Sequence, residues 1–294
     1  MPKESSASKI KLNGFNDLFG MTDSDNLKTD VRDVMLDELY PFEGHPFRVK
    51  EDARMEELVA SIKEHGVLVP GIARIRSKGG YEIIAGHSRK KACELAGLTT
   101  MPMYIRNLTD DLATIVMVDS NIQREDVLPS EKAKAYKMKY DAVKHQGKKG
   151  NALKAMSEES GESGKMIQRY IWLSRLSDDL LDMVDNKKIG FTQGVDISFL
   201  KNKEQKWVLS VIEKGNIKLS LKQSEILKKL SQSGELTEAK VWELLTVSVE
   251  AGKNRKVTLK SEVIKKYFAD FCTEEEIKEI IISLLDNWKR ESER

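Results

Sequence analysis

Residues 80–108 constrain the fold most, because a strand, a glycine turn and the start of a basic helix follow one another without interruption. The apolar run Tyr81–Ala85 ends at Gly86, and a polar, basic cluster then opens the helix: His87, Ser88, Arg89, Lys90 and Lys91. Backbone N–H groups at a helix start carry partial positive charge and suit an anion. Three adjacent basic side chains make phosphate the most fitting anion. The alternative is a strand–helix junction with a solvated basic patch.

Composition limits the class of protein. A chain of 294 residues is long enough for two or three domains, and 33% charged with 40% hydrophobic residues is typical of a soluble globular protein. We find no apolar run that would span a bilayer and no signal-peptide core, so we expect a cytoplasmic protein. Cys93 and Cys272 are the only cysteines, which argues against disulfides and structural zinc. The net charge of +2 means that any nucleic-acid binding comes from local patches.

The N-terminal part divides into a tail and a mixed domain. Residues 1–30 are polar and predict a flexible tail, in which residues 15–19 (Phe-Asn-Asp-Leu-Phe) form either a short docking motif or incidental aromatics. Over residues 31–125 strands and helices alternate. A helix over 54–64 ends at His65-Gly66, strands follow at 67–75, 81–85 and 101–105, and Asp110 starts another helix. This predicts an α+β domain with a small mixed sheet.

No proline follows Pro129, and residues 126–247 predict an all-α domain. Its first helix, over 130–144, is rich in lysine, with Ser130 expected as the N-cap. A boundary is expected near 246–255, followed by a small, mostly helical segment over 248–294 with a short strand at 256–259. The last helix carries an apolar stripe from Ile277 to Trp288, which is expected to pack on the rest of the chain or on a second copy.

Residues 151–168 have the spacing of a helix-turn-helix: a short helix, a polar turn at 160–162, and a new helix from Ser163. The second helix is polar at its start and apolar later, as a recognition helix must be. The predicted DNA-binding residues are Ser163, Lys165, Gln168 and Arg169. The alternative is an ordinary corner between two helices.

Three short segments in order resemble the boxes of the ParB family, the chromosome- and plasmid-partition proteins. Residues 86–92 (Gly-His-Ser-Arg-Lys-Lys-Ala) resemble its GERRxRA box, residues 45–48 (His-Pro-Phe-Arg) a divergent form of the box with QPR, and residues 121–126 the ENxQRxxL box. The resemblance covers roughly residues 31–235. It implies a nucleotide-binding N-terminal domain, a helix-turn-helix DNA-binding domain, and a sliding clamp on DNA that is gated by CTP.

The resemblance also implies a set of site residues. Those assigned to the nucleotide are Gly86, His87, Ser88, Arg89, Lys90, Asn121 and Arg124. Asn121 is further assigned to Mg²⁺ binding and to catalysis. The chain departs from the boxes at His45 (Gln in the family), Phe47 (Arg) and Ser120 (Glu). These departures indicate, at most, slow hydrolysis of CTP to CDP and phosphate, unless Asp119 replaces the missing carboxylate through a shift of helix register.

The partners implied are double-stranded DNA, a second copy of the chain, and a ParA-type ATPase bound through the N-terminal tail; the protein would lie on the nucleoid, away from membranes. Two other classes remain open. One is a transcription regulator that keeps the ParB fold without a nucleotide switch. The other is an enzyme related to sulfiredoxin or to some kinases, although Cys93 lies on the apolar face of its helix and is expected in the core. A chromosomal, plasmid or conjugative role is left undecided.

Overall fold

The computed structural model describes residues 31–146, 152–251, 266–268 and 272–292. The chain forms two units, Met1–Thr246 and Val247–Arg294. The predicted tail over 1–30, with its Phe-Asn-Asp-Leu-Phe stretch, and the predicted strand over 256–259 lie outside the described residues. The domain boundaries at 125 and 247 stay predictions.

A five-stranded mixed sheet forms the N-terminal domain, in the order β1-β5-β3-β4-β2. The strands are β1 (Val31–Met35), β2 (Leu39–Tyr40), β3 (Gly71–Ile75), β4 (Tyr81–Ala85) and β5 (Thr100–Ile105), with the 3-10 helix η2 (Leu36–Glu38) between the first two. β3 pairs antiparallel with β4 across the glycine turn, as expected, and parallel with β5. The strand predicted at 67–75 begins only at Gly71.

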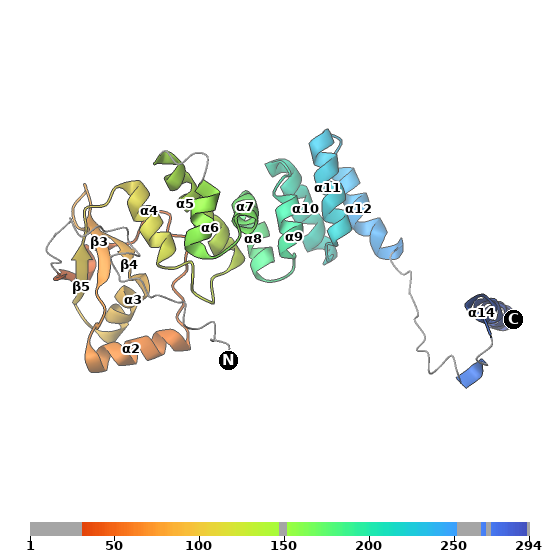
Figure 1. Ribbon diagram of the computed structural model, residues 1–294, viewed down its shortest axis with the longest axis horizontal. Helices are drawn as coiled ribbons and strands as arrows, with labels where there is room; N and C mark the ends of the chain where they lie inside the picture. Colours follow the sequence, from red (N-terminus) through yellow and green to blue (C-terminus); the bar gives the residue numbers. More distant parts are fainter. Residues whose placement is uncertain (1–30, 147–151, 252–265, 269–271, 293–294) are drawn as a thin grey trace, which may run out of the picture. The chain divides into compact units, whose positions relative to one another are not determined.

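Helices cover both faces of the sheet, because successive strand side chains point to opposite sides. Ile83 joins one buried cluster with Met55 of α2 (Ala53–His65) and Cys93 of α3 (His87–Ala96). Its neighbour Ile84 joins a different cluster, with Met117 of α4 (Asp110–Asp119). In Figure 1, α2 and α3 accordingly lie away from α4, which faces the helical part of the chain.

The described chain between α4 and Ala251 is mainly helical, so the predicted α+β domain followed by helices is confirmed. Its helices are α5 (Pro129–His145), α6 (Ala152–Ser160), α7 (Gly164–Leu173), α8 (Asp178–Asp185), α9 (Phe191–Ile197), α10 (Asn202–Gly215), α11 (Leu221–Ser233) and α12 (Glu238–Ala251). The core of α5–α7 is shared with α4: Tyr136, Met156, Ile167 and Met117 lie in one buried cluster. The helix α4, which leads into the family box at residues 121–126, is thereby joined to the helical region through packed side chains.

Two helix ends bear on the sequence predictions. The prediction that Ser130 caps α5 is wrong: the helix begins at Pro129 after the N-cap Leu128, and the fixed φ of proline suits the first helical position. Ser130 is instead buried, and its hydroxyl donates to Asp185 of α8 at 2.5 Å. By contrast, α2 ends at His65 with Gly66 at φ 70°, as predicted.

In the second unit, the described part of the C-terminal segment is mainly α14 (Glu274–Ser292). Several large apolar side chains of this helix are exposed within the described structure: Ile280, Ile282, Leu284, Leu285 and Trp288. No helix in the described ranges combines the length and the apolarity required to cross a membrane.

Candidate functional site

A pocket of about 210 Å³ lies where three segments meet: the loop 45–49, the junction of β4 and α3, and the residues after α4. The residues around it are His45, Phe47, Arg48, Val49, Ala85, Gly86, His87, Ser88, Arg89, Ser120, Asn121 and Arg124. Six of the seven residues predicted to bind nucleotide are therefore gathered at one pocket. The exception is Lys90, whose ammonium group pairs with Glu94 one helical turn further along α3 at 2.5 Å.

Gly86 forms the turn between the sheet and α3. Its φ of 114° is one that side-chain-bearing residues rarely adopt, and a Cβ there would lie 3.3 Å from both the Gly71 Cα and the Met101 Cε. Because the N-cap of α3 is a glycine, no side chain of its own covers the first N–H groups of the helix. The turn is suited to the close approach of an anion to the backbone.

Arg89 faces the loop before β3. Its Nη1 donates to the carbonyl oxygens of Val69 at 2.5 Å and of Pro70 at 2.6 Å. Burial lowers the pKa of this guanidinium from its usual value. A cation held by neutral carbonyls in a partly buried position gains from the arrival of an anion, which compensates its charge.

Two histidines that are far apart in the sequence stack in the pocket wall. The ring centroids of His45 and His87 are 3.8 Å apart, at an interplanar angle of 37°. Nδ1 of His45 donates to the Phe47 carbonyl oxygen at 2.8 Å, and Nε2 of His87 accepts from the Phe42 N–H at 3.3 Å. Burial lowers the pKa of His87 to about 3, so this ring is neutral at physiological pH. The sequence places the two histidines in different family boxes and gives no sign of this contact.

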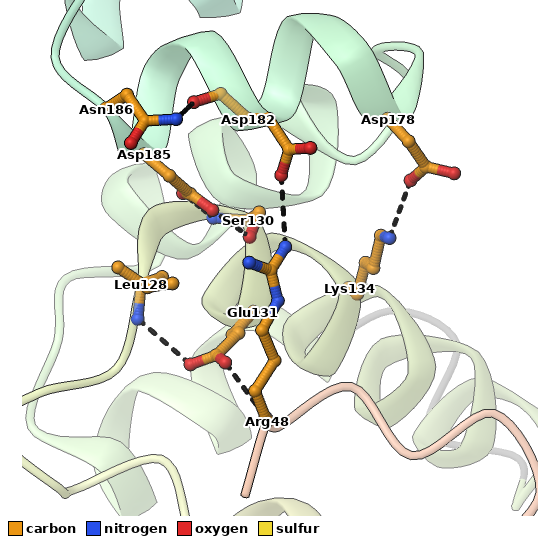
Figure 2. Close-up of polar contacts among 9 residues, drawn as sticks. All are labelled: Arg48, Leu128, Ser130, Glu131, Lys134, Asp178, Asp182, Asp185 and Asn186. Atoms are coloured by element: carbon orange, nitrogen blue, oxygen red, sulfur yellow. Dashed lines mark hydrogen bonds and ion pairs between the residues drawn. The ribbon is translucent and has the colours of Figure 1, made fainter. Parts of the chain in front are cut away.

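Arg48 connects the pocket to the helical region (Figure 2). Its backbone N–H donates to Oε1 of Glu131 at 2.9 Å, and its Nη2 donates to Oδ1 of Asp182 on α8 at 3.0 Å. Glu131 also accepts from the N–H of Leu128 at 3.1 Å, so one buried carboxylate joins the pocket loop to the start of α5. Sequence reasoning placed Arg48 in a box but assigned it no contact.

The residues after α4 complete the pocket. Nδ2 of Asn121 donates to the Met117 carbonyl oxygen at 2.9 Å and to the Ser120 hydroxyl at 3.1 Å, so the amide oxygen is the atom suited to a metal. Arg124 pairs with Asp126 at 3.4 Å. No group of three or more His, Cys, Asp or Glu side chains that could hold a metal occurs in the described ranges. A magnesium ion here would take most of its ligands from phosphate oxygens and water.

Asp119 does not replace the missing carboxylate of the family box. Its Oδ1 lies 2.5 Å from the Nζ of Lys139, a side chain that is only 2% exposed. The same ammonium group contacts Glu159 of α6 at 2.6 Å. The expectation that Asp119 could act at the pocket is therefore wrong, because the carboxylate is bound to α5.

The predicted helix-turn-helix corresponds to α6, a turn and α7. The Ser163 hydroxyl caps α7 by accepting from the Met166 N–H at 3.2 Å. Lys165 is exposed and Gln168 is half-buried. Arg169 is turned toward α9. Its Nη2 donates to the Thr192 hydroxyl at 2.7 Å, and its guanidinium lies 4.9 Å from the centre of the Phe191 ring. Lys165 and Gln168 are thus the better placed of the four predicted residues to contact a ligand.

The lysine-rich face of α5 is largely neutralised. Lys132 pairs with Glu162 at 2.7 Å and Lys134 with Asp178 at 2.7 Å, while Lys137 pairs with an aspartate of its own helix. Figure 2 shows the second of these pairs, which joins α5 to α8. The first two pairs connect α5 to other parts of the helical region, and all three lysines have acidic partners, so they do not form an open basic patch.

Comparison with known proteins finds one family model and several relatives that match this sequence. Residues 21–122 match the family model described as the ParB N-terminal domain. The chain is 31% identical over 192 residues to the stage 0 sporulation protein J of Bacillus subtilis, covering 65% of each chain. It is 28% identical over 211 residues to the probable chromosome-partitioning protein ParB of Vibrio cholerae, covering 71% of this chain and 69% of that relative. The chain thus matches about two thirds of the length of these relatives.

Two solved structures of a C-terminally truncated ParB from Caulobacter crescentus are also similar. One is complexed to the centromeric parS site, with 24% identity and a TM-score of 0.42 over 67% of this chain and 98% of that chain. The other is complexed with CTP-gamma-S, with 23% identity and a TM-score of 0.31 over 63% and 98%. Residues 21–122 therefore match a ParB N-terminal domain, and the chain is similar in sequence to the stage 0 sporulation protein J and to a chromosome-partitioning protein ParB.

Proposed function

We propose that the protein is a sequence-specific DNA-binding partition protein that acts as a CTP-gated dimeric clamp. The observation that carries the proposal is the pocket at Gly86. It joins a helix N-terminus, three arginines (Arg48, Arg89 and Arg124) and the amide of Asn121, a combination that suits a magnesium–triphosphate. The base is taken as cytosine by family resemblance, and a ParB relative is known in complex with a CTP analogue.

DNA recognition is assigned to α7. The exposed Lys165 and half-buried Gln168 belong to its first turns, while Ile167 and Ile171 anchor the helix in the core. A polar side chain such as Gln168 can read base edges, and an ammonium group such as Lys165 contacts phosphates without regard to sequence. The name of the Vibrio cholerae relative, which refers to chromosome partitioning, supports DNA as the partner.

Coupling between the two sites is assigned to the contacts around Arg48. Its guanidinium is bound by Asp182 while its neighbours line the pocket. A bound triphosphate would compete with the Asp182 carboxylate for the Arg48 guanidinium. The nucleotide would therefore have different affinities for the arrangement that keeps the Arg48–Asp182 contact and for the arrangement that lacks it. Hydrolysis is expected to be slow, because Phe47 and Ser120 stand where the family has Arg and Glu, and Asp119 is engaged by Lys139.

The proposal is tested by disulfide or maleimide crosslinking of single cysteines in the N-terminal domain, in a background carrying Cys93→Ala and Cys272→Ala. Leu68→Cys and Ile75→Cys use positions of equal exposure, 73%. The DNA is a cognate duplex selected from a random-sequence library. Crosslinking at one or both positions should rise only when this DNA and CTP are present together. Equal crosslinking in every condition, or a monomer in sedimentation, would contradict the clamp.

A ParB-fold regulator without a nucleotide switch is the second candidate. The observation in its favour is Phe47, which is only 4% exposed and packs in the core where the family box carries an arginine. In that case specific DNA binding would be the same with and without CTP.

A further inference from the structure

We propose that His45 binds a phosphate oxygen in its protonated form, so that triphosphate binding takes up one proton. This inference rests on the proposed function, because it concerns how the same pocket holds its anion. It adds a binding residue and a pH dependence that the family box, with glutamine at this position, does not supply, since an amide cannot gain a proton near neutral pH.

The hydrogen bonds of His45 define which nitrogen is free to change. A carbonyl oxygen only accepts, so the Nδ1 that lies 2.8 Å from the Phe47 oxygen must carry a hydrogen. In the neutral ring, Nε2 is then an acceptor. This Nε2 is buried and has no hydrogen-bond partner in the described structure. An unsatisfied buried acceptor is unfavourable, and a ligand in the adjoining pocket is the group that can relieve it.

A neutral Nε2 is the wrong partner for a phosphate, because two lone pairs would face each other. A protonated ring instead donates from both nitrogens, to the Phe47 oxygen on one side and to the anion on the other. The pocket wall also holds Arg48, Arg89 and Arg124, which shows that the surroundings are built for negative charge. The anion therefore decides the protonation state of the ring.

The charges around His45 come from three other elements. Without an anion, burial lowers the pKa of His45 below its usual 6.5, and Arg124 lowers it further, while the Phe47 carbonyl and Glu131 of α5 act in the opposite direction. His87 on α3, stacked on the ring, is neutral. A triphosphate adds several negative charges at once, which outweighs the single charge of Arg124 and raises the pKa of His45.

The sign of the pH effect follows from linkage. Between the low pKa of the free protein and the raised pKa of the complex, the free ring is neutral and the bound ring is charged, so binding consumes a proton. Affinity then rises as pH falls through this window, by up to about tenfold per pH unit for one proton. Outside this pH range the free and the bound His45 rings carry the same charge, so the affinity no longer depends on pH through His45.

The test is isothermal titration calorimetry of the full chain with Mg²⁺–CTP, in buffers of different ionisation enthalpy between about pH 6 and pH 8, which brackets the histidine range. The slope of the observed enthalpy against buffer enthalpy counts the protons taken up. His45→Gln restores the family residue, and His65→Gln is the matched control at a ring that is 54% exposed at the end of α2. The difference between variants cancels the titration of the nucleotide's own last phosphate proton, whose pKa lies near 6.

We expect the wild type and His65→Gln to take up close to one proton more than His45→Gln, which should bind with little change from pH 8 to pH 6. Equal proton counts in all three proteins would overturn the inference and leave the proposed function intact. The inference would fail in the same way if the His45 ring stayed neutral in the complex, with Nε2 accepting a hydrogen bond from the ligand. If the wild type binds no triphosphate, the proposed function and this inference both fail. Should His45→Gln not bind, NMR of the wild type decides: with only four histidines in the chain, the His45 ring signal must show a pKa that rises on adding Mg²⁺–CTP.

Discussion

Replacing Lys139 with methionine should destabilise the protein far more than replacing an exposed lysine of the same helix. The Lys139 side chain is 2% exposed, and its ammonium group contacts Asp119 at 2.5 Å and Glu159 at 2.6 Å. It therefore joins α4, α5 and α6. Methionine keeps the aliphatic length of the side chain but leaves two carboxylates together without a cation.

The size of the effect follows from how buried the remaining charges are. Removing one partner of a fully buried ion pair costs about 3–5 kcal/mol. Asp119 is 30% exposed and Glu159 52% exposed, so water offsets part of this loss and we expect about 2–3 kcal/mol. For a domain of this size that corresponds to a fall in Tm of about 4–12 °C.

The loss should also depend on pH. Burial raises the pKa of Asp119 above its usual 3.8 even with the lysine present, and removing the lysine raises it further. An acid whose pKa is higher in the folded than in the unfolded state loses stability as pH rises through these values. The deficit of the variant is therefore largest near pH 7 and shrinks toward about pH 4.

Urea and thermal unfolding followed by circular dichroism measure both effects. Lys137→Met is the control, because its pair with Asp141 is exposed and lies within one helix, where such pairs contribute about 0.3–0.5 kcal/mol. A Lys139→Met variant that matches this control at every pH would refute the assignment of a buried bridge between the three helices.

Three further outcomes are expected. Gly194→Ala in α9 should cost about 1–3 kcal/mol in urea unfolding, because its Cβ would lie 2.9 Å from the side chains of Leu173 and Val184; an unchanged midpoint would show that Gly194 is not packed closely against these two residues. In gel-shift titrations, Gln168→Ala should relax the preference for one base position by about 1–3 kcal/mol, whereas Lys165→Ala should weaken binding to all duplexes alike. Unchanged binding by both variants would exclude α7 as the helix that contacts the DNA bases. Gly86→Val should abolish CTP binding in equilibrium dialysis and, because a φ of 114° disfavours a side chain, also lower the midpoint of urea unfolding; retained CTP binding would show that the nucleotide does not bind at this turn.

Local sequence signals predicted the elements of the fold well. The turn at residues 78–80 and the glycine at the end of α2 are specified by backbone conformations that few other residues adopt. The error at Ser130 has a similarly local cause: Pro129 occupies the first helical position, so the cap must precede it. The partner of the Ser130 hydroxyl, Asp185, is 55 residues away and no short pattern indicates it.

The lining of the candidate pocket was predictable from the residues of the family boxes, whereas the contacts that each side chain makes were not. Lys90 leaves the pocket for an i,i+4 pair with Glu94, which the helical spacing itself would have indicated. The stacking of His45 on His87 and the reach of Arg48 to Asp182 depend on how the loop crosses α3 and α8. Such contacts arise only once the domain is folded.

The central claim is that the pocket at Gly86 binds a magnesium–triphosphate, and equilibrium dialysis of labelled CTP against the full chain measures this most directly. Arg89→Ala removes a guanidinium from the pocket wall, whereas Lys91→Ala removes a neighbouring charge that pairs with Glu51 outside it. We predict magnesium-dependent binding to the wild type and to Lys91→Ala, and at least a tenfold loss in Arg89→Ala, the effect of about 1.4 kcal/mol expected from one charge-assisted contact. Equal binding by all three proteins, or none by the wild type with and without cognate DNA, would contradict the account.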